Sequence, residues 1–332
     1  MNAPVGVRGY EQQLAEARRF IETHDHYLVV SHVNPDGDAA SSTFAMGWLL
    51  DRLGKTYSLV NEDAIPEKFA YMWGYDQLIR LAALPGDRPI QAIISVDCAD
   101  EARMGRVRER IAANVPLLNI DHHPTNDHFG DVQLIREDAA ATAEVLFELA
   151  EELNVPMTKE LADCIYTGLL TDTGGFRYSN TSPHVMRIAS DLLQHGVEGY
   201  QLAEALLEKI TRTHIAVLQK ALGTLSFASD HQVCWIAVST EVINSTNATP
   251  EDLEGLIQYP RNIEGVEVGL LFKQTEETKV KVSFRSNGRV DVAQVAKSFG
   301  GGGHVRASGC TLEGPLEQVI ERVVAEVGRA LG

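Results

Sequence analysis

Three apolar, strand-like stretches in the first half of this 332-residue chain each end in a group of Asp or His residues. The stretches 27–31, 92–96 and 116–120 are followed by His32-Val33-Asn34-Pro35-Asp36-Gly37-Asp38, by Asp97 and by Asp121-His122-His123. A fourth group, Asp172-Thr173-Gly174-Gly175-Phe176, follows an apolar helical pattern. Carboxylates and imidazoles gathered in this way need positive charge between them, and mixed His/carboxylate ligation suits Mn²⁺. The sequence therefore predicts a site for two divalent cations.

The rest of the first half alternates strand and helix patterns. Predicted strands are 27–32, 57–61, 92–97 and 116–121, and a predicted helix, 38–53, ends at Gly54. Helical patterns follow at 139–153, 159–170, 183–195 and 199–222. This alternation is typical of a parallel sheet with helices on both faces. Ligands of such folds bind beyond the carboxyl ends of the strands, where three of the Asp/His groups lie.

A second, smaller mixed α/β region follows. It contains a predicted strand at 233–239, a hairpin at 266–285 with its turn at 275–278, and a helix at 290–299. The glycine run 300–303 is predicted as a loop, followed by a strand at 304–312 and a helix at 315–331. We predict a catalytic domain over 1–190, a helical linker over 191–222 and a substrate-binding domain over 223–332, with the active site in the cleft between the domains.

Composition limits the class of partner. The formal net charge of −17 argues against coating of long nucleic acid, which requires extended Lys/Arg surfaces. Short anionic substrates, held locally by metals and a few basic groups, agree better with this charge. Four scattered cysteines form no Cys-x-x-Cys pair, and we see no signal peptide or membrane span. We therefore expect a cytoplasmic protein with no membrane partner.

Asp36 and Asp38 allow two interpretations. Both lie on a turn made by Pro35 and Gly37, so Asp38 is also a candidate N-cap of the following helix. A turn with a cap explains these residues by themselves. The neighbouring His32 favours metal ligation instead.

In this order, the Asp/His groups resemble those of the DHH phosphoesterase superfamily, which is named for a triplet like Asp121-His122-His123. The segment Gly300-Gly301-Gly302-Gly303-His304-Val305-Arg306-Ala307-Ser308-Gly309 resembles the glycine-rich signature of the accessory DHHA1 domain. The two resemblances together cover nearly the whole chain. Within the superfamily the chain is most similar to the bacterial nano-RNase/pAp phosphatase group.

The resemblance implies two Mn²⁺ ions per chain, with Mg²⁺ or Co²⁺ as alternatives. One ion would be held by His32, Asp36 and Asp97. The other would be held by Asp38, Asp97, His122 and Asp172. Asp97 would bridge the ions and His123 would face the scissile phosphate, so these two residues are the predicted catalytic ones. Asp121 would orient an imidazole by fixing its tautomer.

The glycine run and nearby basic residues predict an anion-binding site in the second region. Backbone N–H groups approach phosphate where no Cβ intrudes, and arginine offers a bidentate fork. The predicted substrate-binding residues are His123, Arg285, Ser286, Gly302, Gly303, His304 and Arg306. The remaining histidines lack such partners and are predicted to be structural or exposed.

The implied activity is hydrolysis of short oligoribonucleotides and linear dinucleotides to nucleoside 5′-monophosphates, together with dephosphorylation of 3′-phosphoadenosine 5′-phosphate (pAp). A cyclic-dinucleotide phosphodiesterase is the main alternative, and a non-catalytic nucleotide sensor is an alternative of another class. The sequence ranks neither the substrates nor the direction of trimming. It also leaves the oligomeric state open, a homodimer included.

Overall fold

The computed structural model describes residues 5–86, 88–112 and 114–332. The chain divides into two units between Lys209 and Ile210, inside the stretch 191–222 predicted as a linker. Each unit is built around its own six-stranded sheet. Among the described residues, no helix is both long and apolar enough to span a membrane.

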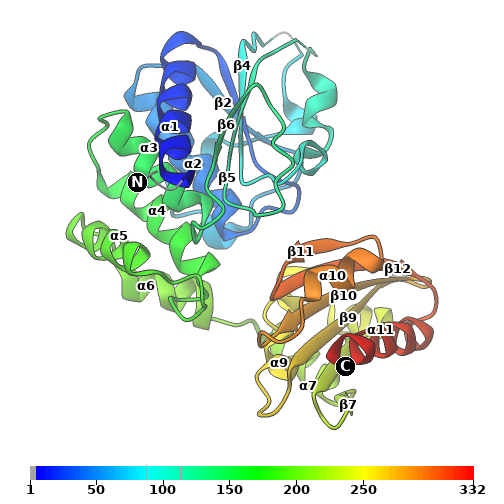
Figure 1. The fold of residues 1–332 in the computed structure, drawn as a ribbon. Helices are drawn as coiled ribbons and strands as arrows, with labels where there is room; N and C mark the ends of the chain where they lie inside the picture. The colour runs from blue at the N-terminus through cyan, green and yellow to red at the C-terminus, as the bar shows by residue number, and fades with distance from the viewer. Residues whose placement is uncertain (1–4, 87, 113) are drawn as a thin grey trace. The chain divides into compact units, whose positions relative to one another are not determined.

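In the first sheet every neighbouring pair of strands is parallel (Figure 1). The strands, in spatial order, are β3 (Ile79–Arg80), β2 (Tyr57–Asn61), β1 (Tyr27–Val30), β4 (Ala92–Val96), β5 (Leu117–Asp121) and β6 (Val132–Ile135). The order reverses between β1 and β4. In open parallel sheets ligands bind beyond the carboxyl ends of the strands at such a reversal.

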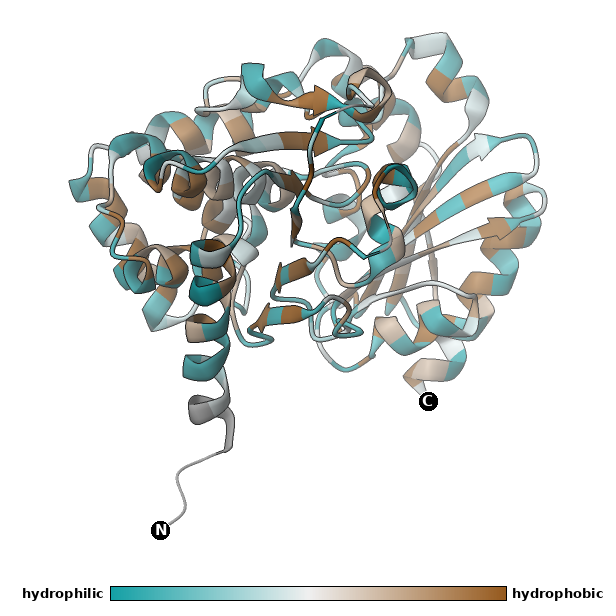
Figure 2. Cartoon of the chain, turned by 90° about the horizontal axis from the view of Figure 1, so that it is seen from above, coloured by the Kyte–Doolittle hydropathy of each residue, from teal (hydrophilic) through white to brown (hydrophobic). Residues whose placement is uncertain are grey.

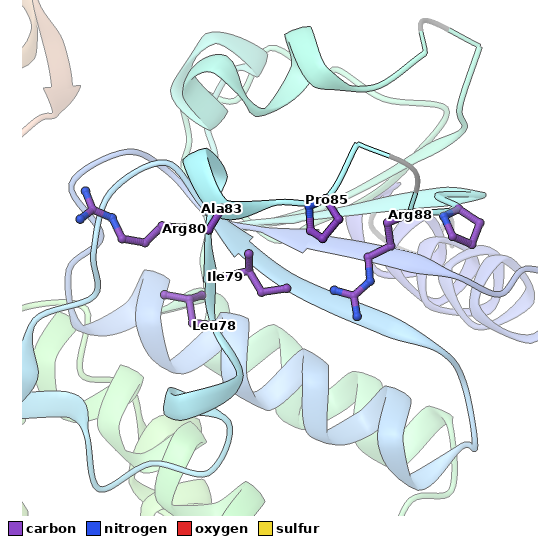
Figure 3. A pocket seen from close by; sticks show the side chains of 7 residues that line it. Leu78, Ile79, Arg80, Ala83, Pro85 and Arg88 are labelled. Carbon is purple, nitrogen blue, oxygen red and sulfur yellow. The ribbon is translucent and has the colours of Figure 1, made fainter.

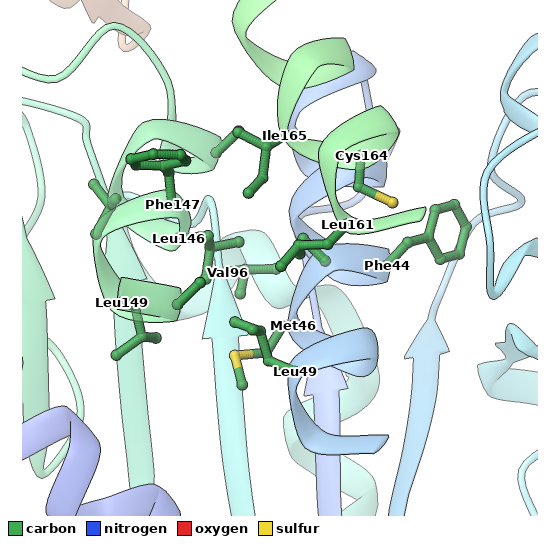
Figure 4. Close-up of a cluster of buried hydrophobic side chains, with 14 of the residues drawn as sticks. Phe44, Met46, Leu49, Val96, Leu146, Phe147, Leu149, Leu161, Cys164 and Ile165 are labelled. Atoms are coloured by element: carbon green, nitrogen blue, oxygen red, sulfur yellow. The ribbon is translucent and has the colours of Figure 1, made fainter. Parts of the chain in front are cut away.

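Helices cover one face of this sheet. These helices are α1 (Val5–Thr23), α2 (Gly37–Arg52), α3 (Thr142–Glu152) and α4 (Lys159–Asp172). Fully buried side chains of α2, α3 and α4, such as Phe44, Leu146 and Ile165, form one core with the sheet (Figure 4). Helix α1, which the sequence analysis did not predict, packs against β6 and α3.

The opposite face of the first sheet differs from the prediction. Its core contains Leu28, Ile93 and Leu117, and the residues that cover it, such as Met104 and Val107, belong to 3₁₀ segments and loops rather than α-helices. The 3₁₀ segments of the first unit are η1 (Glu67–Phe69), η2 (Tyr75–Gln77), η3 (Leu81–Ala83) and η4 (Glu101–Arg110). A left-handed, non-helical glycine, Gly105, interrupts η4, which explains why no regular helix forms there.

The helix predicted over 199–222 is broken. The structure contains α5 (Pro183–Gln194), α6 (Gly199–Ala203), a π-helical turn η5 (Glu204–Glu208) and a separate α7 (Arg212–Leu222). Lys209 is extended, and the side chain of Thr211 accepts a hydrogen bond from the backbone N–H of His214. Thr211 therefore acts as an N-cap that starts a new helix instead of continuing the old one.

The second sheet is mixed, with β8 and β9 parallel and the other pairs antiparallel. In spatial order its strands are β11 (Gly302–His304), β12 (Ala307–Glu313), β10 (Lys279–Ser286), β9 (Val268–Glu276), β8 (Val233–Val238) and β7 (Ser226–Ala228). Its helices are α7, α8 (Thr240–Thr246), α9 (Gln258–Arg261), α10 (Val292–Ser298) and α11 (Leu316–Leu331), with the 3₁₀ segment η6 (Glu251–Leu253). In the second unit, hydrophilic and hydrophobic residues alternate along some of the strands (Figure 2). Burial alternates along β10 and β12, as expected for strands whose two faces differ, whereas β8 and the first half of β9 are buried.

Candidate metal centre

The predicted ligands lie together at the carboxyl edge of the first sheet. His32 follows β1, Asp97 follows β4, and His122 follows β5. Asp97 has a φ of 59°, in the left-handed region that non-glycine residues rarely adopt. A strained residue at a strand end often marks a functional position, and here the turn brings both carboxylate oxygens of Asp97 toward imidazoles.

The first group of candidate ligands is His32, Asp36 and Asp97. The Nε2 atom of His32 lies 3.4 Å from Oδ2 of Asp97 and 3.8 Å from Oδ1 of Asp36. Asp36 is the most exposed of the three, and its Oδ1 accepts hydrogen bonds from the backbone N–H groups of Asp38 and Ala39. Asp36 therefore caps α2, the role that the sequence analysis considered for Asp38.

The second group is Asp38, His122 and Asp172. The Nε2 atom of His122 lies 3.4 Å from Oδ2 of Asp172 and 3.9 Å from Oδ2 of Asp38. Asp38 is buried and accepts hydrogen bonds from the backbone N–H groups of Thr142 and Ala143, at 2.6 and 3.1 Å. It thus occupies the N-terminus of α3, where the helix dipole favours a carboxylate.

Asp97 joins the two groups. Its Oδ2 faces His32, whereas its Oδ1 lies 3.7 Å from Nε2 of His122 and accepts a 2.9 Å hydrogen bond from the hydroxyl of Thr142. One carboxylate with an oxygen directed to each group has the arrangement of a ligand that two cations share.

The backbone fixes which imidazole nitrogens face the centre. The Nδ1 atoms of His32 and His122 lie 2.8 Å and 3.2 Å from the carbonyl oxygens of Val33 and Ala139. Since a carbonyl only accepts, each Nδ1 carries the proton in this arrangement. Nε2 is then the ring nitrogen that faces the carboxylates, and it is the atom that would bind a cation.

His123 has a different partner. Its Nδ1 lies 2.8 Å from Oδ1 of the fully buried Asp121, whose Oδ2 accepts a 2.6 Å hydrogen bond from the side-chain amide of Asn126. Nδ1 also lies 3.7 Å from Oδ1 of Asp97, so His123 can be grouped with Asp97 and His122 as ligands. Because the bond to Asp121 occupies Nδ1, we keep His123 outside the two ligand groups.

Two glycines allow α2 and α4 to approach each other at the centre. A Cβ on Gly168 of α4 would lie 2.6 Å from Oδ1 of Asp38 and 2.5 Å from the Cβ of Ala143. A Cβ on Gly37 would overlap the side chain of Thr171. These contacts explain how Asp172, at the end of α4, reaches ligands that follow the strands.

The electrostatics of the cluster agree with cation binding. Burial and the nearby charge of Asp97 raise the pKa of Asp38 to about 7. Burial, with Asp38 as a further cause, raises the pKa of Asp172 well above its usual value. Burial alone would lower the pKa of His32, but its neighbouring carboxylates more than offset this and raise it to about 10. Four clustered carboxylates and two imidazoles are a donor set that fits divalent cations.

In the second unit, Arg285 lies on β10 and is paired in register with Ala307 of β12, which is also paired with His304 of β11. Arg285 and His304 thus share one face of the sheet on either side of Ala307. Arg306 is exposed, and its guanidinium lies close to Gly288. The role of these basic residues in substrate binding stays a prediction.

The structure corrects the interpretation of the glycine run. Residues 300–303 were predicted as a loop, but Gly302 and Gly303 belong to β11. A Cβ on Gly301 or on Gly303 would overlap the backbone of β12, whereas Gly302 has nothing within 4 Å of a Cβ. Two of the glycines are therefore required by strand packing, and Gly302 is the one with open space before it.

Ser286 does not occupy the position expected of a substrate ligand. Its side chain is fully buried, and its hydroxyl donates a 3.0 Å hydrogen bond to Oε1 of Glu267. The same oxygen accepts hydrogen bonds from the backbone N–H groups of Gly288, Arg289 and Val290. Ser286 thus helps to fix the loop after β10 and is placed to act on substrate only indirectly.

Comparison with known proteins agrees with both units. The DHH family, N-terminal domain, matches residues 26–169, and the DHHA1 domain matches residues 232–332. A Thermus thermophilus protein named bifunctional oligoribonuclease and PAP phosphatase NrnA is 34% identical over 312 residues, which are 91% of this chain and 89% of that protein. The chain belongs to the DHH family.

Other relatives of this DHH-family chain extend over similar lengths. A Bacillus subtilis protein of the same name is 26% identical over 304 residues, 90% of this chain and 92% of the relative. The crystal structure of an exopolyphosphatase-related protein from Bacteroides fragilis superimposes with a TM-score of 0.88 at 25% identity, covering 96% of this chain and 97% of the other. The fold therefore extends over both the DHH and the DHHA1 units.

A hollow on the first unit lies apart from the candidate ligands. It is next to β3 at the edge of the sheet and is lined by Leu78, Ile79, Arg80, Ala83, Pro85, Arg88 and Pro89 (Figure 3). None of the clustered Asp and His residues lines it. The hollow and the candidate metal centre are therefore separate features of the first unit.

Several residues that support the ligands could not be identified from the sequence. Thr142 bonds to both Asp38 and Asp97, Asn126 holds Asp121, and the carbonyl of Ala139 fixes His122. Asn126 lies three residues after His123, so its position in sequence was a weak signal. Neither Thr142 nor Ala139 carries any sequence signal for this role, because their contacts depend on how α3 and its preceding loop meet the sheet.

Proposed function

We propose that this DHH-family chain is a two-metal phosphoesterase that hydrolyses short oligoribonucleotides and linear dinucleotides to nucleoside 5′-monophosphates and dephosphorylates pAp. The observation that supports this most is the position of Asp97, with one carboxylate oxygen facing each of two candidate ligand groups. The names of the Thermus thermophilus and Bacillus subtilis relatives support the substrate class.

His32, Asp36 and Asp97 would hold one divalent cation, and Asp38, Asp97, His122 and Asp172 the other. When bound, two such ions supply Lewis-acid stabilisation of phosphoryl oxygens and promote the ionisation of water. The other residues of the centre orient the ligand side chains. Backbone carbonyls hold the ligand imidazoles, and the hydroxyl of Thr142 holds one oxygen of Asp97.

His123 is suited to stabilise charge on the scissile phosphate. Burial by itself lowers the pKa of His123, but its hydrogen bond with Asp121 and the charge of Asp97 give a net increase. This favours the imidazolium form, in which Nδ1–H donates to Asp121 and Nε2–H remains to donate to a phosphoryl oxygen. Asp121 thus acts through His123 and does not contact substrate itself.

A substrate panel tests the proposed function. The purified chain with Mn²⁺ is assayed on pAp, a linear dinucleotide, oligoribonucleotides of three to five residues, a cyclic dinucleotide, inorganic pyrophosphate and polyphosphate. Nucleoside 5′-monophosphate release from the short linear substrates is expected. Faster turnover of the cyclic dinucleotide would favour the cyclic phosphodiesterase, phosphate release mainly from polyphosphate would overturn the nucleotide assignment, and binding without turnover would indicate a sensor.

Substrate length is expected to have a large effect on rate. An acidic protein with the local basic residues Arg285, His304 and Arg306 can bind a terminal nucleotide but offers little for a polymer. Arg285→Ala and His304→Ala should therefore lower kcat/KM for pAp and dinucleotides much more than for bis(p-nitrophenyl) phosphate, since remote binding energy is expressed at the reacting centre. Steady-state kinetics on both substrate types measures this. Equal losses on both, or processive digestion of long RNA, would contradict it.

Metal preference provides a further prediction. Mixed imidazole and carboxylate ligands should favour Mn²⁺ over Mg²⁺, which prefers oxygen ligands and retains its waters. Chelation should abolish turnover, and Mn²⁺ should restore it better than Mg²⁺ at equal free concentration. Activity that survives exhaustive chelation, or fuller recovery with Mg²⁺, would show that this ligand assignment is wrong.

A further inference from the structure

One face of the second sheet is only partly covered by helices. Along β10, Val280, Val282 and Phe284 enter the core that also contains residues of α10 and α11. Lys281, Ser283 and Arg285 alternate with them and therefore point to the opposite face. On that opposite face a second core, containing residues of α7, includes residues of β8 and β9 but none of β10 or β12. The outer part of this face remains accessible, and Lys281 is exposed.

Two lysines lie opposite each other on this face. Lys273 of β9 is paired in register with Lys281 of β10. Like charges directly opposite across strands destabilise a sheet. Partial burial and the charge of Lys281 lower the pKa of Lys273, and the charge of Glu254 opposes this. In the part of the chain that the structure describes, neither lysine forms an ion pair or a side-chain hydrogen bond.

These two lysines form no ion pair among the described residues although the chain is acidic. The protein has 46 acidic and 29 basic residues, so carboxylates are abundant. Lys279, on the same hairpin, does form an ion pair with Glu276 at 3.2 Å. Two facing ammonium groups that form no ion pair with a carboxylate are therefore suited to an anion from outside the chain.

The strand register relates this pair to the predicted substrate residues. In one row across the face, Arg285 is followed by Ala307 and His304. In the next row, Ser283 is followed by Gly309 and Gly302. The third row contains Lys273, Lys281 and Thr311. Lys281 and Arg285 are four residues apart, about 13 Å along an extended strand.

The middle row consists of small residues on the accessible strands. Ser283, Gly309 and Gly302 project little from the sheet, so the surface between the Arg285 row and the lysine pair is flat. Gly302 has open space where a Cβ would be. A sugar or base can lie on this flat surface while its neighbouring phosphates contact Arg285 on one side and the lysine pair on the other. This arrangement suits a nucleotide chain better than a single inorganic anion.

We propose that Lys273 and Lys281 form a phosphate subsite for single-stranded oligonucleotides, binding a backbone phosphate further along the substrate than the group held by Arg285 and His304. The inference rests on the proposed function and adds to it the residues that distinguish oligomers from the shortest substrates. Substrates that reach the lysine row gain binding energy, and substrates that end at the Arg285 row do not.

Lys281→Ala tests the subsite directly. We expect kcat/KM for tri- to pentaribonucleotides to fall by about 10-fold, with a much smaller change for bis(p-nitrophenyl) phosphate, because a charge-assisted hydrogen bond contributes on this scale. The slope of log kcat/KM against log salt for the oligomers should become shallower by about 0.7, the value for one phosphate contact on a single strand. Lys279→Ala is the matched control and should alter neither quantity.

Lys273→Met separates a binding role from a structural one. Methionine retains most of the apolar stem and removes a partly buried charge that faces another cation, so thermal stability should rise. At the same time kcat/KM for the oligomers should fall. A lower melting temperature with unchanged oligomer kinetics would show that Lys273 is structural and would overturn the proposal.

The outcomes for the subsite and for the proposed function are distinguishable. If wild-type protein turns over no nucleotide, the proposed function fails. If wild type is active but Lys281→Ala keeps the oligomer rate and the salt slope of wild type, only the subsite fails. Equal losses on oligomers and on the small diester, or equal losses with Lys279→Ala, would also overturn the subsite.

Discussion

Asp97→Asn is expected to lower kcat by at least ~100-fold on every substrate, the scale seen when a group that stabilises the transition state is removed. Asparagine keeps the shape of the side chain and tolerates the left-handed backbone at this position, where φ is 59°. It loses the charge that faces both ligand groups. The loss should appear equally on oligonucleotides and on bis(p-nitrophenyl) phosphate, because Asp97 acts at the reacting centre and not on the remote nucleotide.

Asp100→Asn is a matched control for this substitution. Asp100 lies three residues further on, and its side chain accepts a hydrogen bond from the backbone N–H of Arg103 as the N-cap of η4. Asparagine caps helices about as well as aspartate, so activity and stability should stay close to wild type. Steady-state rates and bound-metal content, measured on both variants, test whether Asp97 bridges two cations. Near-normal turnover of Asp97→Asn with two metals bound would show that a bridging carboxylate at this position is not required.

The strand-end position of the ligands could be predicted because it depends on local patterns. Apolar runs ending in His32, Asp97 and Asp121 indicate strands, and the carboxyl ends of parallel strands lie at one edge of a sheet. The structure does bring the predicted ligand side chains within a few ångströms of one another. Their assignment as metal ligands stays a prediction that the variants above test.

Contacts between elements distant in sequence could not be predicted in this way. Asp38 caps α3, which begins 104 residues later with Thr142, and no local signal links the two. Likewise, the sequence predicts the glycine run 300–303 as an anion-binding loop, but Gly301 and Gly303 are required by close contact with the backbone of β12. Close approach and anion binding both require glycine, so the sequence does not distinguish between them.

Helix α1 and the loop before α3 depend on a cluster of charges that the sequence analysis did not identify. Arg136 lies 2.5 Å from Glu148 and 3.4 Å from the buried Glu144. The hydroxyl of Tyr10 on α1 donates a 2.6 Å hydrogen bond to Glu148. Glu144 in turn accepts a 2.7 Å hydrogen bond from the backbone N–H of Ala140. The cluster therefore connects α1 and α3 to the loop before α3.

This loop also supports the candidate metal centre. The backbone N–H of Arg136 donates to the carbonyl of Asp121, and the carbonyl of Ala139 accepts from Nδ1 of His122. Disruption of the charge cluster should therefore affect both stability and metal affinity. Its effect on metal affinity would arise through the orientation of His122 and not through loss of a ligand.

Arg136→Met is expected to lower the free energy of unfolding by about 3–5 kcal/mol, as when one partner of a buried ion pair is removed. Glu144 would then remain buried without its guanidinium. Chemical denaturation of the metal-free protein measures this. The matched control is Arg106→Met, because Arg106 is largely exposed and its ion pair with Glu62 lies at the surface. Exposed pairs contribute about 0–1 kcal/mol, so the control should unfold nearly as wild type does.

The loss in Arg136→Met should depend on pH with a definite sign. Burial already raises the pKa of Glu144 above its usual 4.5, and Arg136 is one of the groups that oppose this rise. Without Arg136 the folded-state pKa rises further, so ionised Glu144 destabilises the fold as pH increases through that value. The difference from wild type should therefore be largest near neutral pH and shrink as pH falls below 4.5, where Glu144 becomes protonated in both the folded and the unfolded state. A difference that is constant over this range would show that Arg136 stabilises the fold through packing against Tyr10 and not through its charge.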